Sequence, residues 1–252
     1  MTVRNLNRRL TDCLKELKLP TVRDAYEEIA DHARKESLSY EEFLLEVVDR
    51  ERDVRRQHRV ERSLRASKLL LEKTLTSFDR KRLPRKVDTH LKILLEGTFL
   101  DRCENVLAFG PPGSGKTHLL CAIGQELVFK GRRVLFRPCD LLVQELLAAK
   151  RDLYLPRLLK QLSRFDALII DDIGYVQHSR QEMEVLFNLL AYRYEQGSVL
   201  ITSNLPFSQW DQIFKDQMTT AAAIDRLVHH SIVLELNIPS YRLEESKKRK
   251  AA

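Results

Sequence analysis

Apolar residues recur at helical spacing in the first part of the chain. Up to about residue 75 they are separated by three or four positions, as at 6, 10, 14 and 17 and again at 43, 44, 47 and 48. This spacing is typical of amphipathic helices that share a small core. Ser39 with Glu42 three residues later predicts a capping box at the start of one helix. We therefore expect a small all-helical domain over residues 1–75.

The pattern changes in the second part of the chain, where short apolar runs alternate with longer segments of helical spacing. The predicted strands are 105–109, 133–137, 166–170, 198–202 and 231–235. Strands that alternate with helices predict a parallel sheet with helices on both faces. The fold class that follows is α/β, with a five-stranded parallel sheet preceded by the helical domain.

The limits of the parts follow from composition. A basic linker is expected at 76–88, the α/β domain at 89–245, and a polar basic tail at 246–252 that is too hydrophilic to pack.

The first predicted strand runs into "FGPPGSGKTHLL", which fits the P-loop pattern G-x-x-x-x-G-K-[ST]. Glycines let backbone N–H groups turn inward around a phosphate, and the start of the following helix adds its positive dipole end. Lys116 is expected to reach the β- and γ-phosphates of ATP, and the Thr117 hydroxyl to ligate Mg²⁺. The alternative is an ordinary glycine-rich turn, but the flanking strand and helix favour nucleotide binding. The predicted ATP-binding residues are Gly110, Pro111, Pro112, Gly113, Ser114, Gly115, Lys116, Thr117 and His118.

A second apolar strand, "FDALIIDDIGY", ends in two carboxylates and resembles a Walker B segment. We expect it to lie beside the P-loop strand with its carboxyl end facing the nucleotide. Asp171 would then hold Mg²⁺, and Asp172 would orient or deprotonate the attacking water. The alternative is a strand that ends in two solvated acids.

Two further segments carry candidate residues. "VLITSN" resembles a sensor 1 strand, which would place Asn204 near the γ-phosphate; a simple strand-to-turn cap is the alternative. "AAAIDRLVHH" places Arg226 where an arginine finger would reach the nucleotide of a neighbouring subunit, unless Arg226 only pairs with a nearby acid.

Together with "LFNLLAYRYEQGSVLITSN", "WDQIF" and "SYRLEE", these segments resemble the transposition helper ATPases called IstB, AAA+ relatives of the DnaC helicase loader. The resemblance implies an ATPase that forms an ATP-dependent homo-oligomer on duplex DNA and presents the DNA to a transposase. Asp172 stands where most AAA+ proteins have Glu, which raises the alternative of an ATP-clamped scaffold with slow turnover. A loader of a replicative helicase is a further alternative. The chain ends soon after residue 245, so we expect no AAA+ lid domain, and Arg242 is a candidate for the sensor 2 position.

The distribution of charge along the chain adds one further prediction. The net charge is +7, and lysines and arginines far outnumber acids between residues 50 and 92. Arg52, Arg55, Arg56, Arg59 and Arg62 recur at spacings of three and four, so they share one helix face. Such a row suits the phosphates of duplex DNA, although a solvated face or an acidic protein partner would give the same pattern.

Composition excludes several classes of protein. The 4 cysteines form no C-x-x-C pair, and the 7 histidines show no zinc-binding spacing. No apolar run is long enough for a membrane span, and the N-terminus lacks the apolar core of a signal peptide. We expect a cytoplasmic protein that does not contact a membrane.

Overall fold

A computed structural model describes residues 3–174, 179–210, 217–241 and 243–244. The chain divides into two compact units, residues 1–62 and 63–252. This division lies earlier than the limit near residue 75 that the sequence suggested. The reason is that Leu69 is buried in the core of the second unit, where Leu64, Leu70 and Leu75 also pack.

The first unit is helical, as the apolar spacing predicted. It contains α1 (Val3–Glu16), α2 (Pro20–Glu36) and the beginning of α3 (Tyr40–Ser67). The predicted capping box is confirmed: the Ser39 amide donates to Glu42 Oε2 at 2.8 Å, and the Glu42 amide donates to Ser39 Oγ at 3.2 Å. The small core consists of Leu14, Val22, Ala25, Ile29 and Val47.

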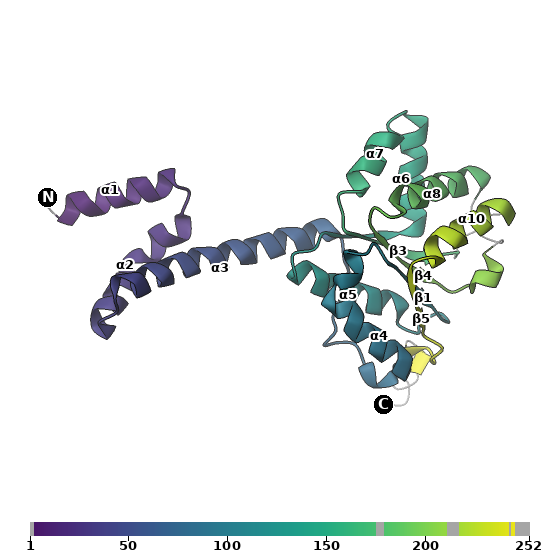
Figure 1. Cartoon of the computed structure of the whole chain (residues 1–252), viewed down its shortest axis with the longest axis horizontal. Coiled ribbons are helices and arrows are strands. Elements are labelled where there is room, and N and C mark those ends of the chain that lie inside the picture. Colours follow the sequence, from purple (N-terminus) through teal and green to yellow (C-terminus); the bar gives the residue numbers. More distant parts are fainter. Residues whose placement is uncertain (1–2, 175–178, 211–216, 242, 245–252) are drawn as a thin grey trace. The chain divides into compact units, whose positions relative to one another are not determined.

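The second unit contains the predicted five-stranded sheet, and all four strand pairings are parallel. Its strands are β1 (Asn105–Phe109), β2 (Val134–Pro138), β3 (Ala167–Ile173), β4 (Ser198–Ser203) and β5 (Ser231–Glu235). The order across the sheet is β2-β3-β4-β1-β5 (Figure 1).

The strand order corrects one expectation. The acidic strand β3 does not lie beside the P-loop strand β1, because β4 pairs with both of them. All six residues of β4 are buried, as a strand at the centre of a parallel sheet requires. The polar end of β4 therefore lies between the P-loop and the two carboxylates of β3.

Helices cover both faces of the sheet (Figure 1). One face carries α4 (Arg85–Glu96) and α5 (Lys116–Phe129), and the other carries α6, α7, α8 and α10. The latter four span Cys139–Arg151, Leu155–Leu162, Arg180–Arg193 and Gln217–Val228, and short 3₁₀ turns occur at Arg80–Arg82, Thr98–Leu100 and Phe207–Gln209.

The expected linker is part of the second unit. Residues 76–88 contain the turn at 80–82 and the start of α4, and their apolar side chains Leu83 and Val87 are buried in the core. The segment therefore packs on the α/β unit instead of spanning an open gap.

Candidate functional site

The P-loop lies between the end of β1 and the start of α5, as predicted. Gly113 and Gly115 have φ values of +79° and +94°, which L side chains rarely adopt. A Cβ atom on Gly113 would stand 2.1 Å from Ser240 Oγ. The positive φ values therefore favour glycine at both positions, and the space beside Gly113 is already occupied by Ser240.

Lys116 is the buried cation of the loop, with only 5% of its surface exposed. Its Nζ donates to the carbonyl oxygens of Gly110 and Pro111 at 2.8 and 3.0 Å. It also donates to Asn204 Oδ1 at 2.6 Å. The structure thus brings the proposed sensor residue at the end of β4 into contact with the P-loop lysine.

Thr202 joins Asp171 and Asp172 of β3 to the end of β4. Its Oγ1 donates to Asp171 Oδ1 at 2.7 Å and accepts the backbone N–H of Asp172, also at 2.7 Å. Asp172 has a φ of +60°, which is uncommon for a residue other than glycine and lies within the register shift between Ile170 and Ile173. Such local backbone strain is frequent at functional sites. The shift leaves Asp171 half-buried and Asp172 exposed toward the P-loop.

A cavity of about 400 Å³ lies over the loop. Most of the predicted residues line it, together with several that no motif indicated. The predicted residues in its wall are Pro112, Gly113, Ser114, Gly115, Lys116, Thr117, His118, Asp172 and Asn204. The residues that the sequence did not indicate are Lys73, Ser77, Phe78, Asp79, Arg82, Ile238 and Tyr241. Except for Lys73, which precedes it, these come from the expected linker and from the segment after β5, where spacing alone carries no signal of a binding site.

His118 contacts the expected linker. Its Nε2 lies 2.9 Å from the Thr74 carbonyl oxygen and 3.3 Å from Ser77 Oγ. Its ring also meets Phe78 edge to face at a centroid distance of 5.0 Å. Because a carbonyl only accepts, Nε2 carries the hydrogen, and His118 holds segment 74–78 against α5.

The residues present fit a bound triphosphate with Mg²⁺. Ser114 Oγ is buried and has no hydrogen-bond partner within the described part of the chain. A buried hydroxyl calls for such a partner, and a phosphate oxygen is one. The described ranges contain no cluster of three or more His, Cys, Asp or Glu side chains. Magnesium bound to a nucleotide needs only one or two protein ligands, because phosphates and water supply the rest, so the two predicted ligands, Thr117 and Asp171, would be enough in number.

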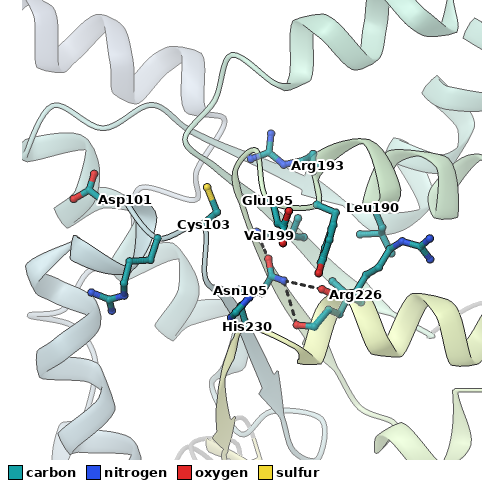
Figure 2. Close-up of a pocket in the computed structure, with 12 residues that line it drawn as sticks. Asp101, Cys103, Asn105, Leu190, Arg193, Glu195, Val199, Arg226 and His230 are labelled. Carbon is teal, nitrogen blue, oxygen red and sulfur yellow. Dashed lines mark hydrogen bonds between the residues drawn. The ribbon is translucent and has the colours of Figure 1, made fainter.

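The structure places Arg226 at the opposite end of β1 from the P-loop, since the Asn105 side chain at the start of that strand donates to the Arg226 carbonyl at 3.5 Å. Figure 2 shows Arg226 and Asn105 in the wall of one pocket. A pocket of about 320 Å³ is found there, lined in part by Asn105, the first residue of β1, and by His230, which precedes β5. The Arg226 guanidinium donates to the Ala222 carbonyl at 3.0 Å and lies 5.0 Å from the centroid of the Phe187 ring on α8. Among the residues with described positions, no carboxylate forms an ion pair with it.

Arg193 lines the same pocket and is 1% exposed. Its Nη1 donates to the Leu162 carbonyl, and its Nη2 to the carbonyls of Phe165, Asp166 and Ser198. Burial lowers the pKa of Arg193 to about 10, so the guanidinium stays charged at neutral pH.

The predicted arginine row lies on α3, and its members differ. Arg55 donates to the buried Glu51 at 2.6 Å, and it also bonds to the Lys18 carbonyl. Arg52 pairs with Asp49 at 3.1 Å, and Arg62 donates to the His58 carbonyl at 3.2 Å. Arg56 and Arg59 are exposed, and no ion pair involving them occurs in the described residues. The remaining candidate, Arg242, lies outside the described residues.

Comparison with known proteins identifies the family. The sequence profile described as IstB-like ATP binding protein matches residues 12–251. The chain belongs to this family. An insertion sequence ATP-binding protein of Sinorhizobium fredii is 40% identical over 235 residues, which cover 93% of this chain and 79% of the relative. The IS21 putative ATP-binding protein of Pseudomonas aeruginosa is 41% identical over 238 residues, or 93% and 89% of the two chains.

Solved structures show the fold of this IstB-family chain. The DnaC helicase loader matches with a TM-score of 0.53 at 20% identity, over 60% of this chain and 87% of the loader. AMPPCP-bound DnaA from Aquifex aeolicus matches with a TM-score of 0.57 at 20% identity, over 73% of this chain and 56% of DnaA. The second unit is therefore an AAA+ type P-loop fold. None of the helices within the described ranges is both long and apolar enough to cross a bilayer.

Proposed function

We propose that this IstB-family protein is a Mg²⁺-dependent ATPase that assembles on duplex DNA and presents the DNA to a transposase. One observation carries the proposal: the P-loop and the carboxyl ends of β3 and β4 meet at one cavity. Lys116 of the P-loop contacts Asn204, and Thr202 ties Asp171 to the same end of β4. The family membership adds the link to insertion sequences, since the relatives are named as their ATP-binding proteins.

The roles follow from position. The backbone N–H groups of Gly113 to Thr117 and the Lys116 ammonium would hold the phosphates. Thr117 and Asp171 would hold Mg²⁺, which when bound neutralises charge on the phosphates. Asp172 projects into the cavity and would orient a water or accept its proton. Asn204 would fix the position of Lys116.

The opposite end of the sheet would complete the site of a neighbouring subunit. The five-residue strand β1 separates the end of the sheet at Arg226 from the P-loop, a distance of roughly 13 Å along the sheet. Such a separation favours action on the nucleotide of a second copy over action within one chain. A guanidinium placed in this way stabilises the charge that develops during phosphoryl transfer.

Asp172 supports a second candidate, the ATP-clamped scaffold with slow turnover. Its side chain is one methylene shorter than that of Glu, and its backbone is held in the left-handed region. Phosphate release measured at steady state, with and without duplex DNA, separates the two functions. Stimulated turnover supports the ATPase, whereas stable assemblies without turnover support the scaffold.

Duplex DNA binding tests the partner. We expect the wild type to form DNA-bound oligomers in sedimentation velocity only when ATP and Mg²⁺ are present. Lys116→Ala should form none, while Lys130→Ala, which changes an exposed lysine near the end of α5, should behave like the wild type. Equal assembly with and without ATP would contradict the proposal.

The arginine row can be tested by salt dependence. Arg56 and Arg59 are the members with neither an ion pair nor a side-chain hydrogen bond in the described part of α3, so the double change to Ala should weaken binding to all duplex sequences alike. The slope of log affinity against log salt should fall by about 1.8, because each phosphate contact contributes about 0.9. An exposed arginine outside the row, Arg34, supplies the matched control. An unchanged slope would mean that the arginine row is a solvated face or contacts a protein partner instead of DNA.

A further inference from the structure

The segment that follows β5 crosses the P-loop. The Leu236 amide donates to the Phe109 carbonyl at 2.7 Å, and the Tyr241 amide donates to the Gly113 carbonyl at 3.0 Å. Ser240 fills the space that a side chain on Gly113 would need. We call the described residues of this segment, 236–241 and 243–244, the strap, and its contacts through Leu236, Ser240 and Tyr241 place it directly on the loop that would hold the phosphates.

Arg82 attaches the strap to the turn at 80–82. Its Nη2 donates to the Pro239 carbonyl at 3.0 Å and to Glu244 Oε1 at 2.8 Å. Its guanidinium also lies 5.3 Å from the centroid of the Tyr241 ring. An ion pair near the surface stabilises little by itself, but three contacts from one planar group fix the strap in one orientation.

The cavity wall combines two kinds of surface. The loop from Gly113 to Thr117 and the Lys116 ammonium form a polar part that suits phosphates. Phe78, Ile238 and Tyr241 add aromatic and aliphatic surface, beside polar side chains from residues 73–82. Aromatic and apolar surfaces suit the face of a planar base.

We propose that the strap closes the base side of the nucleotide pocket and that Arg82 is the positioning residue that holds it there. Arg82 thereby determines how tightly the nucleoside part of ATP binds, while the phosphates are held by the P-loop. The inference rests on the proposed function in taking a nucleotide as the ligand. It adds residues of the expected linker and of the strap that the P-loop motifs do not include.

Comparing two ligands in calorimetric titrations with Mg²⁺ tests this division. ATP carries both parts, whereas inorganic tripolyphosphate carries only the phosphates. Arg82→Ala should weaken the affinity for ATP about tenfold, in the range seen when aromatic stacking on a base is lost. The affinity for tripolyphosphate should stay unchanged. Tyr241→Ala should give the same split. Arg80→Ala is the matched control, because Arg80 pairs with Asp88 and does not line the cavity, so both affinities should stay at the wild-type value.

Each of the other possible results contradicts either the strap proposal or the proposed function. If Arg82→Ala weakens the binding of both ligands equally, or does not weaken ATP binding, the proposed role of the strap is wrong. A wild type that binds ATP no more tightly than tripolyphosphate would overturn it too, yet leave the phosphate site intact. A wild type that binds neither would remove the proposed function itself. If Arg82→Ala lowers the melting temperature, Tyr241→Ala decides, because that ring is 48% exposed and its loss leaves the core unchanged.

Discussion

The two ends of the parallel sheet each hold a buried cation among neutral oxygens. At the carboxyl end, Lys116 donates to two P-loop carbonyls and to Asn204. At the amino end, Arg193 donates to the carbonyls of residues 162, 165, 166 and 198. Both side chains are at most 5% exposed, so burial does not distinguish them.

Their surroundings do distinguish them. Lys116 borders a cavity with a buried, unpartnered hydroxyl on Ser114 and an exposed carboxylate on Asp172. Arg193 bonds the carbonyl at the end of α7, two carbonyls in the turn before β3, and the carbonyl of the first residue of β4. A buried cation thus indicates a ligand site when space and further donors adjoin it, and a structural role when it satisfies backbone carbonyls.

The largest expected effect concerns Asp172 at the carboxyl end. Asp172→Asn keeps the size of the side chain but removes the group that would accept a proton, so hydrolysis should slow about 10³-fold while ATP affinity changes little. Phosphate release and calorimetric ATP titration measure the two quantities. The change should leave the melting temperature unaltered, since Asp172 is exposed. A variant that hydrolyses at the wild-type rate would remove the assignment.

Lys116→Ala should weaken ATP binding about 100-fold, because a buried charged donor to the phosphates is lost. The free energy of unfolding should change far less, since the three oxygens that it bonds lie at the cavity, where water can replace the ammonium. Urea unfolding of the same sample provides that value. If ATP affinity is unchanged, the P-loop assignment is wrong.

Arg193→Ala should show the reverse pattern. Removing a guanidinium that serves buried carbonyls should cost about 3 kcal/mol or more of unfolding free energy. Arg164→Ala, an exposed arginine in the same region, should cost less than about 0.5 kcal/mol. At temperatures where Arg193→Ala stays folded, its ATP affinity should match the wild type. A large loss of affinity without a loss of stability would overturn the comparison.

Glu51 in the first unit offers the smallest effect, and it is a buried charge that pairs with Arg55. Burial raises its pKa, but hydrogen bonds from Arg55 and the Val22 amide outweigh this and hold the pKa below the ordinary 4.5. The resulting stabilisation is present above about pH 4.5 and is lost as the pH falls through the folded-state pKa. Glu51→Gln should therefore reduce protection of α2 amides in hydrogen exchange at pH 7 by about 1 kcal/mol or less, and by nothing at acid pH. An equal loss at both pH values would point to packing instead of charge.

Local pattern was sufficient for the elements and the motif residues. The strands, the P-loop and the Ser39 capping box depend on spacing and on residue type over a few positions, which a sequence displays directly. The family resemblance is likewise confirmed by the matching profile and relatives.

Long-range contacts were not predictable. Nothing in the spacing of β3 indicated that β4 would separate it from β1, because strand order depends on how whole faces are buried. For the same reason the sequence did not indicate that Arg82 would meet Glu244. Nor did it indicate that Arg55 would pair with Glu51, while Arg56 and Arg59 have no ion pair in the described part of α3.

The central claim is that the carboxyl end of one sheet and the amino end of another form a single site. Mixing two inactive variants, Asp172→Asn and Arg226→Ala, tests it in one measurement of ATP hydrolysis on duplex DNA. If the ends meet across subunits, some mixed interfaces combine an intact Asp172 with an intact Arg226, and the mixture should hydrolyse ATP although neither variant does alone. If mixed oligomers form but show no activity at any ratio, Arg226 acts within its own chain or only supports the fold, and the account is contradicted.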